Sequence, residues 1–100
     1  MKGKTKLPLV VLISGSGSNL QAIIDAVAGG LPAAIRAVIS NQPAAYGLQR
    51  ARQAGIPTRV LDHRDFSSRE DYDRVLAHLV DSLHPQLIVL AGFMRILTAD

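Results

Sequence analysis

Residues 9–14 (LVVLIS) are an apolar run of Leu, Val and Ile that leads directly into the glycine-rich segment 15–19 (GSGSN). A run without alternating polar residues is typical of a strand buried on both faces, as in a parallel sheet that helices cover. The apolar residues beyond it recur at the i, i+3, i+4, i+7 spacing of one helix face, and they are Leu20, Ile23, Ile24 and Val27. Gly29 and Gly30 then end this helix. A buried strand, a tight loop and a helix predict a fold in which helices are layered on a parallel sheet.

The same alternation of strands and helices continues along the chain. Residues 34–40 (AIRAVIS) predict a second strand, and residues 46–54 predict an alanine-rich helix that ends at Gly55. A third strand is expected at residues 57–61 and a fourth at residues 87–91 (LIVLA).

A third helix is expected between the last two strands. Ser67 as N-cap and Glu70 three residues later match a capping box. One apolar stripe follows, formed by Tyr72, Val75, Leu76, Leu79, Val80 and Leu83. We expect this helix to end at His84, because the residue before a proline, here Pro85, is disfavoured in the helical region.

This order of elements predicts an α/β fold with a Rossmann-like parallel sheet flanked by helices and the strand order 3-2-1-4. The fourth strand would then lie at an open edge, although it is wholly apolar and carries no proline or charge of the kind that protects edges. Thr98 also resembles the N-cap of a further helix. We therefore expect residues 1–8 to be a flexible tail, and residues 9–100 to be the N-terminal part of a domain that is incomplete at its C-terminal side or is completed by another chain.

Composition excludes several classes of protein. One hundred residues, 48% of them apolar, describe one folded domain. The absence of cysteine excludes a disulfide scaffold, a thiol nucleophile and a Cys-built metal site. The absence of cysteine also fits a reducing cytoplasm, and no apolar run approaches the ~20 residues of a membrane span. We therefore expect a cytoplasmic protein with no membrane partner. Lys2, Lys4 and Lys6 of the tail carry part of the net charge of +3, so this charge gives no reason to expect a nucleic-acid partner.

Segment 15–19 is a candidate phosphate site because it joins a strand to a helix N-terminus, where backbone N–H groups and the helix dipole attract an anion. Gly17 lets the backbone approach the phosphate oxygens, while Ser18 and Asn19 add a hydroxyl and an amide. A plain tight turn stays open as the alternative. A dinucleotide site is disfavoured, because Leu20 stands where its third glycine belongs and Asn41 where its acidic residue belongs.

Other candidate residues are less specific. His63, His78 and His84 lack the spacing of metal ligands, so no metal is expected. Arg69 occupies the first turn of the third helix, where the dipole disfavours a positive charge, and this suggests either another use or an ordinary exposed arginine. Residues 92–97 (GFMRIL) follow the fourth strand at the ligand-binding edge of the sheet, where they either line a pocket for a flat heterocycle or pack a further element.

Four segments together resemble the phosphoribosylglycinamide formyltransferase family: VVLISGSGSNLQAIIDA, SNQPAAYGLQRARQAGIPT, FSSREDYDR and LIVLAGFMRIL. The resemblance spans nearly all of residues 9–100. It implies transfer of a formyl group from 10-formyltetrahydrofolate to the amine of glycinamide ribonucleotide in purine synthesis. The related methionyl-tRNA formyltransferases and formyltetrahydrofolate deformylases match the 15–19 segment and the last segment less well.

The resemblance also implies roles for single residues. It implies that the ribonucleotide phosphate rests on Gly17, Ser18 and Asn19, and that the folate contacts Arg69, Met94, Arg95, Ile96 and Leu97. The family's catalytic Asn-x-His-Pro-Ser motif and later Asp are not in this sequence, and the His84-Pro85 pair lacks the asparagine and precedes the fourth strand. We therefore expect no catalytic residue in this chain and no activity from these 100 residues alone.

Two alternatives stay open at this point. One is a phosphate-binding α/β module without catalysis, and the other is another folate-dependent formyltransferase or deformylase. The sequence also leaves open whether the chain forms a homodimer.

Overall fold

The computed structural model describes residues 6–92, and in them the predicted alternation of strands and helices is present. The elements are β1 (Leu7–Ile13), α1 (Ser18–Ala28), β2 (Ala33–Ser40), α2 (Tyr46–Gln53), β3 (Thr58–Val60), the short 3-10 helix η1 (His63–Asp65), α3 (Arg69–Ser82) and β4 (Leu87–Leu90). The four strands form one parallel sheet in the order β3-β2-β1-β4. The predicted α/β class and strand order are therefore confirmed.

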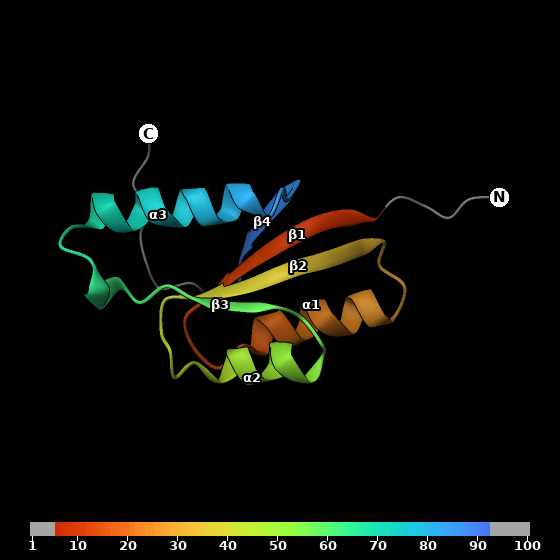
Figure 1. The fold of residues 1–100 in the computed structure, drawn as a ribbon. Coiled ribbons are helices and arrows are strands. Elements are labelled where there is room, and N and C mark those ends of the chain that lie inside the picture. The colour runs from red at the N-terminus through yellow and green to blue at the C-terminus, as the bar shows by residue number, and fades with distance from the viewer. Residues whose placement is uncertain (1–5, 93–100) are drawn as a thin grey trace.

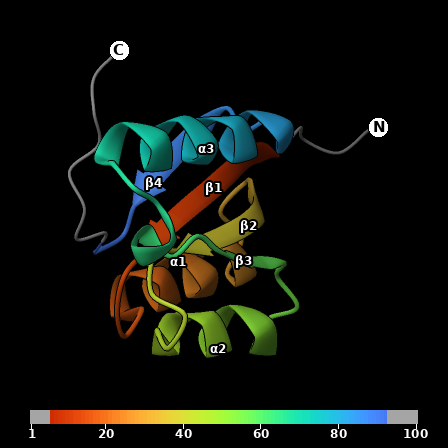
Figure 2. The same cartoon turned by 60° about the vertical axis from the view of Figure 1, so that its left-hand side comes forward.

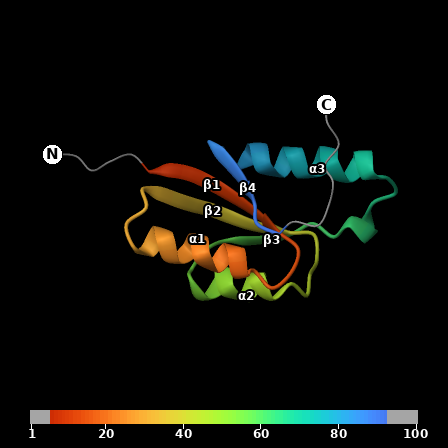
Figure 3. The ribbon, with the colours of Figure 1, turned by 180° about the vertical axis from the view of Figure 1, so that it is seen from behind.

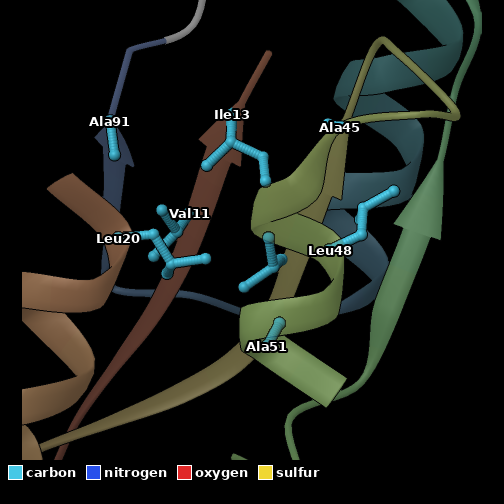
Figure 4. Packing of buried hydrophobic residues seen from close by; sticks show 8 residues of the cluster. Val11, Ile13, Leu20, Ala45, Leu48, Ala51 and Ala91 are labelled. Atoms are coloured by element: carbon cyan, nitrogen blue, oxygen red, sulfur yellow. The ribbon is translucent and has the colours of Figure 1, made fainter. Parts of the chain in front are cut away.

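The sheet lies between two helical layers. Helices α1 and α2 cover one face, and α3 covers the other (Figures 1, 2 and 3). Because successive side chains of a strand point to opposite faces, β1 contributes to both cores. One core contains Val11 and Ile13 with residues of α1 and α2 (Figure 4), and the other contains Val10 and Leu12 with residues of α3. This burial on both faces explains the unbroken apolar run of β1.

Strand β1 begins two residues earlier than predicted, so Leu7 and Pro8 belong to the sheet and not to a tail. Pro8 has no N–H to donate, but its carbonyl accepts from the Gln86 N–H at 2.9 Å, before the pairing of β1 with β4 begins at Leu9. The Pro8 nitrogen, which carries no hydrogen, therefore faces the β4 side at a level before β4 begins. No strand–strand hydrogen bond is lost there.

The N-cap of α3 is Ser68, which corrects the prediction of Ser67. The Ser68 hydroxyl accepts from the Asp71 N–H at 3.1 Å, and the Ser67 hydroxyl donates to the Asp71 carboxylate at 3.0 Å. Asp71 therefore occupies the third helical position that the sequence assigned to Glu70. Two adjacent serines followed by two adjacent acids make both registers plausible, and the structure uses the second.

Strand β4 is an exposed edge, as the predicted strand order requires. Leu87, Ile88 and Leu90 are 48%, 47% and 55% exposed, whereas Val10 and Val11 of the adjacent β1 are fully buried. An edge strand with this many exposed apolar side chains is unusual, because edges of soluble proteins commonly carry charges or proline.

Candidate functional site

The connection between β1 and α1, residues 15–19, is hereafter called the 15–19 loop. Gly17 is the N-cap of α1 in the left-handed conformation, with φ 81° and ψ 23°, and no side chain caps this end of the helix. A hollow of about 250 Å³ lies beside the loop, lined by residues 14–19 and by Ala91 and Gly92 after β4. The helix N-terminus therefore opens toward a concave space at the carboxyl edge of the sheet, where α/β proteins bind their ligands.

The predicted phosphate-binding residues Gly17, Ser18 and Asn19 all line this hollow. Ser18 and Asn19 are exposed, while Gly17 is buried against α2. The side chains of Ser18 and Asn19 and the first-turn N–H groups thus lie within one small region, which suits an anion with several oxygens. The assignment of a phosphate to them stays a prediction.

The ends of β1 and β2 are tied together beside the loop. The Ser14 hydroxyl donates to the Asn41 side-chain oxygen at 2.7 Å, and Asn41 is only 4% exposed. Asn41 stands at the position where a dinucleotide-binding chain carries an acid. Its amide oxygen here serves as a structural acceptor for the residue that opens the loop.

Helix α2 contacts the back of the loop. The Gly47 N–H donates to the Gly15 carbonyl at 3.0 Å, and Arg50 Nε donates to the Ser16 carbonyl at 2.7 Å. Sequence patterns did not single out Gly47 or Arg50. The one available signal is Gly47 itself, because a glycine in a helix is a poor choice unless a close contact requires it.

The segment between β3 and α3 holds a compact ion pair. The Arg64 guanidinium contacts both carboxylate oxygens of Asp62, and the shortest contact is 2.7 Å. The backbone N–H of Arg64 donates to the same carboxylate at 3.0 Å. These hydrogen bonds from the Arg64 side chain, and then from its backbone, lower the pKa of Asp62 from 3.8 to about 2.

Arg69 is exposed at the first position of α3. The start of α3, where Arg69 is the first residue, lies at the same edge of the sheet as the 15–19 loop, but α3 covers the opposite face (Figure 1). Met94, Arg95, Ile96 and Leu97 lie outside the described residues. The described part of the chain thus brings together the predicted phosphate site but only one residue of the predicted folate site.

Residues 6–92 contain no group of three or more His, Asp or Glu side chains arranged to hold a metal ion. Within the same range, none of the helices has both the length and the apolar character required to traverse a lipid bilayer.

Two further hollows lie near α2. One of about 580 Å³ adjoins the outer side of the 15–19 loop and includes Gln42 and Tyr46. The other, of about 360 Å³, is lined by Ile24, Val27, Ala28, Ile35, Ala54 and Ile56. The second hollow has no polar side chain that would hold an anion and lies toward the C-terminal half of α1, away from the loop.

The family profile and the relatives that match this chain point to the same family. A family profile described as Formyl transferase matches residues 7–100. The phosphoribosylglycinamide formyltransferase of Escherichia coli (strain K12) is 58% identical over 91 residues, which are 90% of this chain and 43% of that protein. The trifunctional purine biosynthetic protein adenosine-3 of Drosophila melanogaster is 52% identical over 102 residues, or 99% of this chain and 8% of that protein.

A solved structure shows the same similarity in three dimensions. The phosphoribosylglycinamide formyltransferase of Coxiella burnetii, determined in complex with CHES, matches with a TM-score of 0.91 at 58% identity. The match covers 93% of this chain and 44% of that one. The chain therefore spans less than half the length of these two bacterial relatives.

Proposed function

This chain belongs to the formyl transferase family, as a homologue of phosphoribosylglycinamide formyltransferase over about the N-terminal half of those proteins, and we propose that it supplies their substrate-binding side. The reaction moves a formyl group from 10-formyltetrahydrofolate to the amine of glycinamide ribonucleotide. The observation that carries the proposal is the left-handed Gly17 N-cap, which opens the first turn of α1 toward the hollow beside β4.

The 15–19 loop binds the ribonucleotide phosphate in this proposal. The N–H groups of the first turn of α1 have no capping side chain, and the helix dipole places partial positive charge at that end. The Ser18 hydroxyl and the Asn19 amide add donors without adding a counter-charge. Such a site fixes the phosphate end of the substrate and leaves its amine free to reach toward the rest of the sheet edge.

Arg69, Met94, Arg95, Ile96 and Leu97 form part of the folate side in this proposal. Arg69 is exposed at the carboxyl edge of the sheet, where its guanidinium can attract the glutamate carboxylate of the folate. Residues 94–97 follow β4 in sequence and supply apolar side chains and backbone groups for the pterin ring.

The chemistry requires groups that this sequence lacks. The substrate amine attacks the formyl carbon to form a C–N bond, the bond from that carbon to N10 of the folate breaks, and a proton passes from the amine to N10. The resemblance assigns stabilisation of the oxyanion and movement of the proton to an Asn-x-His-Pro-Ser motif and a later Asp. This chain's part is therefore to bind and orient the two substrates.

Calorimetric titration with inorganic phosphate and with glycinamide ribonucleotide tests the phosphate assignment. We expect both to bind, to compete with each other, and to shift the amide NMR signals of Ser18 and Asn19. Titrations in which neither ligand binds, or in which the shifts occur away from the 15–19 loop, would reject the proposal.

A polypeptide limited to these 100 residues should bind ligand without transferring formyl groups. Each oxyanion donor commonly contributes roughly 10² to 10³ in rate, and the family's donors are missing here. A spectrophotometric assay of folate deformylation with glycinamide ribonucleotide as acceptor checks this expectation, and turnover above the background rate would contradict it.

A further inference from the structure

Helix α2 holds two consecutive carbonyl groups of the 15–19 loop. The Gly15 carbonyl accepts from the Gly47 N–H at 3.0 Å, and the Ser16 carbonyl accepts from Arg50 Nε at 2.7 Å. No peptide bond in the described residues is cis, and in a planar trans peptide the N–H points opposite to the C=O. The N–H groups of Ser16 and Gly17, which share peptides with these carbonyls, are therefore turned away from α2.

The direction in which these N–H groups point matters for the hollow beside the loop. That hollow is lined by residues 14–19 and by the end of β4, and no residue of α2 lines it. By drawing the carbonyls to one side, α2 presents the N–H donors to the other side, where an anion can be bound.

Gly47 is the point of closest approach between α2 and the loop. A Cβ atom at Gly47 would lie 2.5 Å from Ile13 Cδ1 and 3.0 Å from Gly17 Cα, and a Cβ at Gly17 would lie 2.5 Å from Gly47 Cα. Figure 4 shows the Ile13 side chain at the end of β1, directed toward α2. Alanine is the better helix former, so the glycine at position 47 serves this backbone-to-backbone contact and not the helix.

Arg50 is itself held in place on several sides. Its guanidinium carbon lies 5.1 Å from the centre of the Tyr46 ring, and Nη1 donates to the Gln21 side-chain oxygen of α1 at 3.3 Å. The planar guanidinium thus links α2, the loop and α1 at once, which a flexible lysine ammonium would do less well.

We propose that Gly47 and Arg50 are positioning residues for phosphate binding, which they support by fixing the carbonyl groups of Gly15 and Ser16. The inference rests on the proposed phosphate site. Gly47 acts by leaving room for the loop, and Arg50 acts through the Ser16 carbonyl without needing to contact the ligand.

The test is titration of inorganic phosphate into the protein and three variants. Binding is measured by calorimetry and by the amide NMR signals of Ser16 and Gly17. We expect Gly47→Ala and Arg50→Gln each to weaken phosphate binding by about tenfold or more, the factor of one charge-assisted hydrogen bond. The phosphate-induced shifts of Ser16 and Gly17 should shrink in both variants. Arg52→Gln is the matched control, because Arg52 lies exposed in the last turn of the same helix and carries the same charge.

Salt separates geometry from charge. Repeating the titrations at about 0.5 M salt screens long-range attraction, and the loss in Arg50→Gln should persist while Arg52→Gln stays within about twofold of the unchanged protein. Equal losses in Arg50→Gln and Arg52→Gln that vanish in salt would overturn the role of Arg50.

Unchanged phosphate binding in folded Gly47→Ala would overturn the role of Gly47. If that variant does not fold, the double variant Gly47→Ala with Ile13→Val takes its place, because it removes the atom at 2.5 Å in the core while keeping the tight contact with Gly17 Cα at 3.0 Å. Unchanged phosphate binding in the double variant would overturn the role of Gly47 in the same way.

These outcomes differ from failure of the proposed function. Absence of phosphate binding in the unchanged protein would reject the phosphate site itself. Binding in the unchanged protein that survives in Gly47→Ala and Arg50→Gln would reject only the positioning role.

Discussion

The 15–19 loop and the segment 62–68 both leave the carboxyl edge of the sheet, but they are held in different ways. The loop region is fixed by residues far along the chain: Ser14 pairs with Asn41, 27 residues away, and Ser16 with Arg50, 34 residues away. The segment 62–68 is fixed by its neighbours, since Asp62 pairs with Arg64 two residues on and Ser67 with Asp71 four residues on. The shape of the loop is a property of the fold, whereas the shape of the segment is largely local.

This difference has consequences for function. A loop fixed by distant elements is organised before a ligand arrives, which lowers the entropy that binding costs. Arg69, which follows the locally held segment, is exposed and has a long side chain that loses freedom when it binds. The phosphate side should therefore depend on backbone geometry, and the contribution of Arg69 to the folate side should depend on its charge.

Replacing Gly17 with valine should give the largest effect, the loss of phosphate binding. A β-branched residue is strained at φ 81°, at a cost of order 1–3 kcal/mol, and its Cβ would lie 2.5 Å from Gly47 Cα. Calorimetry with inorganic phosphate measures the loss. Gly55→Val is the control, because Gly55 also has a positive φ, +75°, but has nothing within 4 Å of its Cβ position. If Gly55→Val loses as much phosphate affinity as Gly17→Val, general destabilisation and not the loop contact explains the effect.

Replacing Arg69 with alanine should have an intermediate effect, confined to the folate side. Loss of a charge-assisted contact should weaken binding of a stable folate such as 5-formyltetrahydrofolate by about 1 to 3 kcal/mol, while binding of glycinamide ribonucleotide stays almost unchanged. The comparison is made by calorimetry on the protein and its variants. Arg74→Ala is the control, since Arg74 lies on the same helix and pairs with Asp71. Equal losses for both ligands, or none for folate, would refute the assignment of Arg69.

The sequence was sufficient to predict the position of the loop from local patterns, and the strand order from the connection rules of parallel α/β sheets. The apolar run before Gly15 and the repeat beginning at Leu20 each reflect one element packing on the sheet. Gly47 and Arg50 were missed because their partners lie about thirty residues earlier and no periodicity links them. The N-cap of α3 was misplaced by one residue, because Ser67 and Ser68 satisfy the same pattern.

The smallest expected effect concerns the pH dependence of the locally held segment. The Arg64 hydrogen bonds lower the pKa of Asp62 from 3.8 to about 2, so the folded state favours the charged carboxylate. The stability that this pair adds is therefore fully present above pH 3.8, and it is lost as the pH falls through about 2. Asp62→Asn should lower the melting temperature slightly at neutral pH, because the Arg64 side chain is 67% exposed and ion pairs open to water contribute little. The gap to the unchanged protein should close between about pH 4 and pH 2. Asp65→Asn removes a carboxylate from the short helix that Asp62 caps, and thermal melts of both variants across this range give the comparison. A gap that stays constant down to about pH 2, or one of equal size in Asp65→Asn, would show that the segment 62–68 does not depend on the Asp62–Arg64 pair. A loss of phosphate binding in Asp62→Asn would show that the 15–19 loop and the segment 62–68 are not independent.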